Sequence, residues 1–160
     1  MLAVDSYHVV LALHIIAVLV AYGVPLAYPI LLPYLRRRHP RAMPGVHDVQ
    51  HRLNLLLTGP GTVLVLAFGL YMAGKDHLFG ESWVQVGIGA IAFIAIVGGW
   101  IVRASSRMAE LAAADVAAAG PDGPVTWSPA YEALYRRYSR VEEVLGLVVL
   151  VTIFFMATKP

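Results

Sequence analysis

A single histidine lies inside the first apolar run of the chain. His14 falls within Tyr7–Tyr34, which carries no charged side chain, and Pro25, Pro29 and Pro33 follow it at four-residue spacing. An imidazole surrounded by hydrocarbon must still satisfy its donor and its acceptor. Either a freed backbone carbonyl accepts its proton, or one ring nitrogen ligates a haem iron while a hydrogen bond holds the other. His14 is therefore the candidate cofactor-binding residue.

A second group of polar side chains lies near the ends of the apolar runs that are close to the arginines. These side chains are expected at a similar depth in a membrane. Carboxylates at a membrane boundary are costly unless they are paired, and the sequence offers arginines and a histidine nearby as partners. Such a layer either clamps helix ends together or forms a pocket where a glutamate and a histidine exchange protons or hold a polar group. The candidate pocket residues are His51, Asn54, Thr58, Arg103, Arg140, Glu142 and Glu143.

His47 and His51 are four residues apart, a spacing that can place two imidazoles on one metal ion. Two ligands are a weak signal, because a structural zinc site uses four, and the polarity of a helix surface explains the pair equally well. The chain has no cysteine, so it supplies no disulfide and no thiolate ligand. It also contains no HExxH motif, phosphate-binding glycine loop or nucleophile elbow.

Four apolar runs must position these residues. The chain has 160 residues, 59% of them hydrophobic, and a mean hydropathy of +0.69. These runs predict membrane spans over residues 7–34, 51–73, 83–103 and 131–157, the third continuing as a helix to 119. Gly59–Pro60–Gly61 is expected to bend or locally open the second span. The predicted fold is all-α, a single integral membrane four-helix bundle over 1–160 with up-down topology.

The basic residues predict how the bundle is oriented. Ten of the twelve lysines and arginines lie between spans one and two or between spans three and four. By the positive-inside rule these connections are cytoplasmic, which predicts a multi-pass protein of the cytoplasmic (inner) membrane with both termini outside. Aromatic and basic residues from Tyr131 to Arg140 suit the membrane interface. Nucleic-acid binding is not expected, because no aromatic-interleaved platform accompanies the arginines.

The third span carries a face of small residues between Gly87 and Gly99. Small residues let helix backbones approach closely in lipid, so they suit packing within the bundle or against a second copy of the chain. The expected partners are therefore the lipid bilayer and, through this face, a homodimer.

Three segments resemble the spans of one membrane protein family. LHIIAVLVAYGVPLAYPILLPYLRRR, RLNLLLTGPGTVLVLAFGLYMAG and SRVEEVLGLVVLVTIFFMATKP are similar to spans one, two and four of HemJ-type protoporphyrinogen oxidases and related CopD-like and uncharacterised four-span bacterial proteins. The resemblance covers about two thirds of the chain. It implies a four-helix bundle that binds b-type haem through His14, with Glu143 matching the last-span glutamate. HemJ-like third spans resemble W-x-x-x-K, whereas this chain has Gly87 at the lysine position, so the resemblance does not extend to porphyrinogen oxidation.

Three functions follow as hypotheses. The first is a haem-binding membrane redox protein with His14 as axial ligand to haem b. The second is a small-solute or ion transporter or channel, whose path would follow the proline-broken first two spans to the polar pocket. The third is an assembly or scaffold subunit that associates through the small-residue face.

Overall fold

The first span is a broken helix. In the computed structural model, which describes residues 6–159, α1 (Ser6–Tyr22) and α2 (Tyr28–Arg38) flank a short 3-10 turn at Pro25–Ala27. The two parts of the span are bent by 43°. Proline has no backbone N–H and its ring clashes with the carbonyl one turn back, so a regular helix ends before Pro25 and begins again around Pro29.

The second span is one long helical segment with an irregular turn inside it. After a 3-10 turn at Pro40–Ala42, α3 (Met43–Leu53) leads through a π-helical turn, Asn54–Thr58, into α4 (Gly59–Lys75). The N–H of Gly59 donates to the carbonyl of Asn54, five residues earlier. Pro60 follows directly and has no N–H to donate, which favours a change of hydrogen-bond pattern at this point. The local opening therefore lies immediately before the Gly-Pro-Gly sequence.

The last two spans are long helices with well-defined ends. After a 3-10 turn at Leu78–Gly80, α5 runs over Ser82–Ala118, and Gly120 follows it with a φ of 66°. The last helix, α6 (Pro129–Thr158), begins at the N-cap Ser128, whose side chain accepts from the N–H of Tyr131. The 37 residues of α5 span about 56 Å. This length exceeds a hydrocarbon layer of about 30 Å, so α5 extends beyond the membrane.

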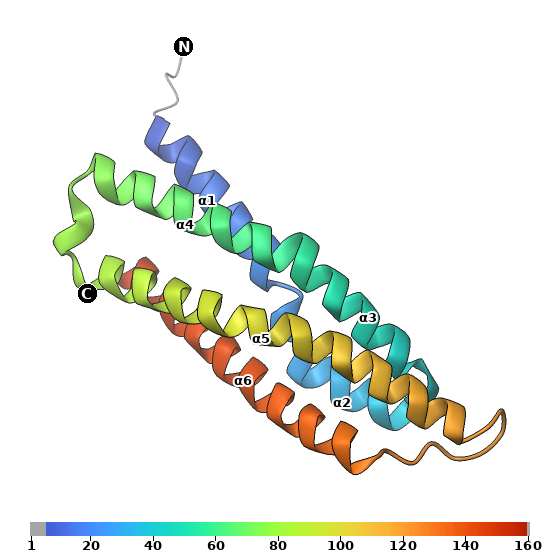
Figure 1. Cartoon of the computed structure of the whole chain (residues 1–160). Helices are drawn as coiled ribbons and strands as arrows, with labels where there is room; N and C mark the ends of the chain where they lie inside the picture. The colour runs from blue at the N-terminus through green and yellow to red at the C-terminus, as the bar shows by residue number, and fades with distance from the viewer. Residues whose placement is uncertain (1–5, 160) are drawn as a thin grey trace.

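The helices pack as two pairs, which are joined where α3 packs against α5. α1 packs on α4, and α5 packs on α6, while α3 packs along the second half of α5 (Figure 1). We call the end at Ser6, Lys75, Ser82 and Thr158 the open half, and the end at Arg38, Ala118 and Pro129 the basic half. The basic half holds the larger apolar core, which includes Leu32, Met43, Ile101, Met108 and Ala112. The open half holds a smaller cluster around Ala21, Val65 and Ile94.

The described residues, 6–159, contain helices and no strand. Three of the helices are long and apolar enough to cross a membrane, and the bent first span makes a fourth. The predicted all-α membrane fold is confirmed.

The three tyrosines at the start of the last span face the interior of the protein. Tyr131, Tyr135 and Tyr138 are all buried in the core of the basic half, and their expected place at the membrane interface stays a prediction. Their spacing of four and three residues places them on one helix face, and that face packs inward. Tyr131 and Tyr135 stack with their ring centroids 5.8 Å apart.

Candidate functional site

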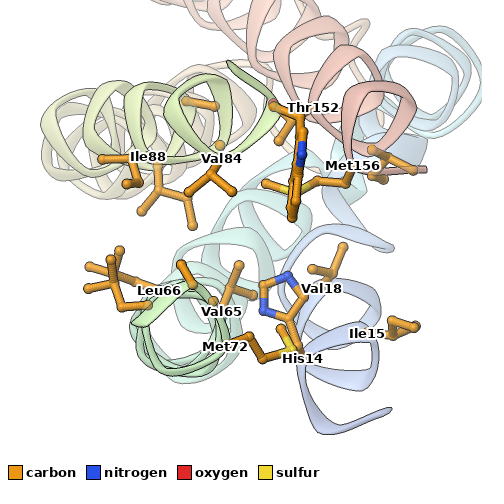
Figure 2. Close-up of a pocket in the computed structure, with 18 of the residues that line it drawn as sticks. His14, Ile15, Val18, Val65, Leu66, Met72, Val84, Ile88, Thr152 and Met156 are labelled. Carbon is orange, nitrogen blue, oxygen red and sulfur yellow. The ribbon is translucent and has the colours of Figure 1, made fainter. Parts of the chain in front are cut away.

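A large apolar cavity lies between the two helix pairs in the open half. Its volume is about 560 Å³, and its walls come from α1, α4, α5 and α6. Aliphatic side chains form most of the lining, and Figure 2 shows those of α4, such as Val65 and Leu66, facing Val84 and Ile88 of α5 across the space. A volume of several hundred cubic ångströms with apolar walls and few polar groups is typical of small-molecule and cofactor sites.

His14 is the most polar group deep in this lining. The imidazole projects from α1 into the space between the helix pairs (Figure 2). The ring lies beside the Val65 backbone, and its buried Nδ1 has no hydrogen-bond partner. Gly69 makes room for the ring, because a Cβ at that position would lie 3.3 Å from the Cε1 of His14. The histidine therefore has a fixed orientation and an unsatisfied nitrogen.

The wall opposite His14 contains one hydroxyl and one thioether. Thr152 donates its hydroxyl proton to the carbonyl of Val148 at 2.7 Å, so that group is satisfied within α6. Met156 lies across the backbone of Gly87, and a Cβ at Gly87 would overlap the methionine methyl group. The space beside Gly87 is thus filled by a thioether from another helix. Lys159, at the open end of α6, also lines the cavity.

A buried hydrogen-bonded chain lies in the basic half. His47 is fully buried, its Nδ1 is 2.7 Å from the Oε1 of Gln50, and its Nε2 is 2.9 Å from the hydroxyl of Tyr131. Gln50 then donates from Nε2 to the hydroxyl of Tyr138 at 3.5 Å. Because both nitrogens of His47 are used, this histidine joins α3 to α6 and is not available as a metal ligand.

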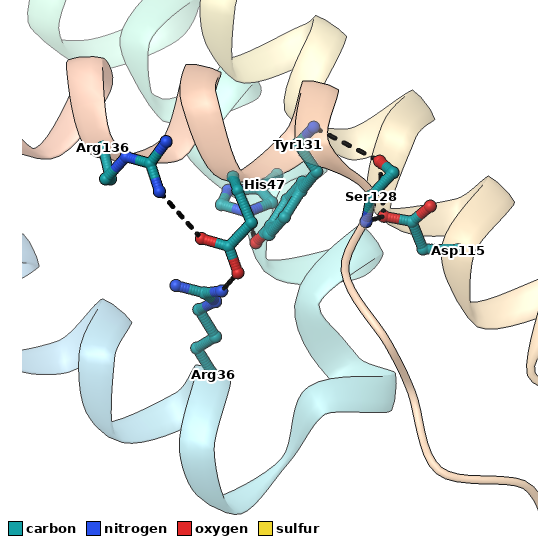
Figure 3. Close-up of polar contacts among 7 residues, drawn as sticks. Arg36, His47, Asp115, Ser128, Tyr131 and Arg136 are labelled. Carbon is teal, nitrogen blue, oxygen red and sulfur yellow. Dashed lines mark hydrogen bonds and ion pairs between the residues drawn. The ribbon is translucent and has the colours of Figure 1, made fainter.

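An aromatic cage around Arg36 closes the same end of the bundle. The guanidinium carbon lies 4.6 Å from the ring centroid of Tyr135 and 5.8 Å from that of Trp127. Figure 3 shows Arg36 and Arg136 both reaching one carboxylate, that of Glu132. Cation–π contacts and an ion pair together tie α2 to the start of α6.

The predicted polar pocket is divided by the structure. Asn54 and Glu142 lie inside the bundle, with 4% and 6% of their surfaces exposed. His51 is half-buried and interacts through Nδ1 with the carbonyl of Val102, and Thr58 donates to the carbonyl of Ala21. The other three members are on the exposed surface of their helices: Arg103, Arg140 and Glu143.

None of the expected ion pairs of the two glutamates forms among residues 6–159. The ion pairs there join Arg36 and Arg136 to Glu132, Arg52 to Asp48, and Arg107 to Glu110. No group of three His, Cys, Asp or Glu side chains in this part of the chain is arranged to hold a metal ion. The sequence analysis did not identify Tyr28, Gln50 and Tyr138 as part of this region. Tyr28 and Tyr138 interact with Glu142 in place of the arginines, and Gln50 donates to Tyr138.

The small-residue face of α5 is only partly used within the chain. Gly87 is buried under Met156, whereas Gly89 and Gly99 are exposed and a Cβ at either would meet nothing within 4 Å. The homodimer through this face stays a prediction.

Long apolar helices around an internal cavity define a polytopic helical membrane protein. The family described as "Predicted integral membrane protein (DUF2269)" matches residues 8–160, and the chain belongs to this family. No curated protein and no solved structure matches the chain.

Proposed function

We propose that this membrane protein binds haem b in the cavity of the open half, with His14 as an axial ligand. The observation that supports the proposal is a buried imidazole with an unpartnered nitrogen at the edge of an apolar cavity of about 560 Å³. A haem iron needs only one or two side-chain ligands. Haem binding therefore does not require a cluster of three ligands, and residues 6–159 contain none.

The residues around the cavity suit each part of this cofactor. The Val65 backbone beside the His14 ring can hold one ring nitrogen through a hydrogen bond, which leaves the other nitrogen for the iron. The aliphatic side chains of α4 and α5 would exclude water from the macrocycle. Lys159, whose ammonium lies 5.3 Å from the ring centroid of Trp83, offers a positive charge for a propionate.

When bound, haem supplies one-electron transfer. The residues of the chain would set its environment: His14 as ligand, and Met72 and Met156 as soft thioethers in the lining. With Gly87 in place of a lysine, the proposal is electron transfer and not porphyrinogen oxidation.

The test is the absorption spectrum of the protein purified from cells supplied with haem precursor. We expect a Soret band in the wild type and in His39→Ala, whose histidine is exposed, and loss of the band in His14→Ala. Circular dichroism checks that the variants keep their helical content. Colourless wild-type protein, or a full Soret band in His14→Ala, would overturn the proposal.

A further inference from the structure

Three buried polar side chains lie in the interior of the bundle and are not part of the lining of the cavity at His14. Tyr28 of α2, Asn54 of the π-helical turn and Glu142 of α6 are 2%, 4% and 6% exposed. The hydroxyl of Tyr28 and the Nδ2 of Asn54 have no hydrogen-bond partner. Leaving a buried polar group unsatisfied costs about 1–3 kcal/mol, so two such groups beside a carboxyl call for an explanation.

The contacts of Tyr138 and Glu142 show that these groups form one cluster. Tyr138 lies one turn before Glu142 on the same face of α6, and it interacts with both Glu142 and Asn54. Tyr28 interacts electrostatically with Glu142 across the α2–α6 interface. The cluster lies where the backbone is irregular, between the 3-10 turn of the first span and the π-helical turn of the second. Such turns often accompany functional sites in helices.

The distance of the cluster from the ends of the helices in the open half places it near one boundary of the membrane. Asn54 lies about 32 Å from Lys75, and Glu142 about 24 Å from Thr158, on a rise of about 1.5 Å per residue. The hydrocarbon layer is about 30 Å thick, so Glu142 is within it and Asn54 is at its edge. An ionisable side chain at such a position is costly and commonly serves ion or proton movement.

No positive charge balances Glu142 in the part of the chain that the structure describes. The titratable groups that face it are Tyr28 from α2 and Tyr138 from its own helix. From α5, the nearest arginine along the helix is Arg103, which is exposed and has no ion pair with Glu142. A buried carboxylate without a cation must be neutralised in another way, and the smallest cation that can do so is a proton.

The hydrogen-bonded chain of the basic half is directed toward this carboxyl. The Oε1 of Gln50 can only accept, so the Nδ1 of His47 carries the proton and its Nε2 accepts from Tyr131. Gln50 donates in turn to the oxygen of Tyr138, which leaves the hydroxyl proton of Tyr138 for Glu142. An amide does not relay protons, so this chain orients the carboxyl, and protons must reach it from the side of Tyr28 and Asn54.

We propose that Glu142, Tyr28 and Asn54 form a proton-binding site inside the membrane, in which the Glu142 carboxylate takes up one proton from water and returns it. The apolar surroundings of the carboxyl favour its neutral form. The ionised form would accept hydrogen bonds from Tyr138, from the Tyr28 hydroxyl and from the Asn54 amide, the last two of which now have no acceptor. The site thus offers a stable environment for both charge states. This proposal does not rest on haem binding at His14.

The test is pH-difference infrared spectroscopy of the full chain in lipid nanodiscs. We expect one titrating carboxylic acid C=O band in the wild type and in the matched control Glu143→Gln, whose side chain is exposed. Glu142→Gln should remove the band completely, and Glu142→Asp, which keeps a carboxyl, should move it. Tyr28→Phe and Asn54→Leu should each shift the midpoint of the titration, because they remove donors to the ionised form. Transfer to D2O should shift the band within the mixing time.

Three results would overturn the proposal. A titrating band that persists in Glu142→Gln would place the proton elsewhere. A band that depends on Glu142 but does not exchange in D2O over hours would indicate a sealed structural acid. A midpoint that moves with sodium concentration at constant ionic strength would indicate a metal cation site.

Discussion

Replacing Gly61 by alanine should destabilise the bundle at the closest approach of α1 and α4. A Cβ at Gly61 would lie 2.7 Å from the Cβ of Ala21 and 3.2 Å from its Cα. Carbon atoms in contact are normally about 3.5–4.0 Å apart, so the two helices must separate by about 1 Å. A gap of that size forfeits about a quarter to a half of the dispersion energy of the contacts it opens. Overpacking of this kind costs about 1–3 kcal/mol.

The assay is reversible unfolding in detergent micelles, followed by far-UV circular dichroism. Gly98→Ala in α5 is the matched control, since a Cβ there meets nothing within 4 Å. Alanine is a better helix former than glycine by about 1 kcal/mol, so this control should be as stable as the wild type or more stable. If Gly61→Ala is as stable as Gly98→Ala, the inferred contact between α1 and α4 is wrong. Because α1 also carries His14, Gly61→Ala should in addition weaken any Soret band.

Three further variants test polar side chains of the basic half. Tyr131→Phe removes the partner of the His47 Nε2 and should lower the free energy of unfolding by about 1–3 kcal/mol. Tyr28→Phe removes a buried hydroxyl that has no partner and should leave the free energy of unfolding unchanged or raise it. If Tyr28→Phe were more destabilising than Tyr131→Phe in the same assay, the assigned contacts would be contradicted. Asp115→Ala removes the acceptor of both the N–H and the hydroxyl of Ser128, at 2.9 and 3.0 Å. It should speed limited proteolysis between α5 and α6, and unchanged cleavage would show that this contact does not hold the connection.

The helical character of the chain could be predicted because each span carries its own signal. Long apolar runs specify membrane helices without reference to their neighbours. The break at Pro25 follows equally from local chemistry, since proline cannot continue the hydrogen-bond pattern. The cavity around His14 has no such local signal. It depends on how far the α1–α4 pair stands from the α5–α6 pair, which is a property of packing between segments distant in sequence.

The arginines of the basic half also show that contacts between distant segments cannot be predicted from local sequence. Charge counting treats Arg36 as one member of a topology signal, equivalent to Arg37 and Arg38. In the structure Arg36 is the one that lies over three aromatic rings and pairs with Glu132, while Arg37 and Arg38 are exposed. The rings belong to Trp127, Tyr131 and Tyr135, which are far from Arg36 in the sequence. Only the tertiary fold distinguishes three consecutive residues of the same type.

The two adjacent glutamates of α6 can be distinguished from the sequence by their place on the helix. Glu142 and Glu143 differ by about 100° around the helix axis, so only one of them can share a face with the buried tyrosines. The positions Tyr131, Tyr135, Tyr138 and Glu142 follow one another at intervals of four, three and four, the spacing of a single helix face. Glu143 falls outside this series and is exposed. Once Tyr131 and Tyr138 are recognised as core residues, the periodicity of α6 alone selects Glu142 as the buried acid.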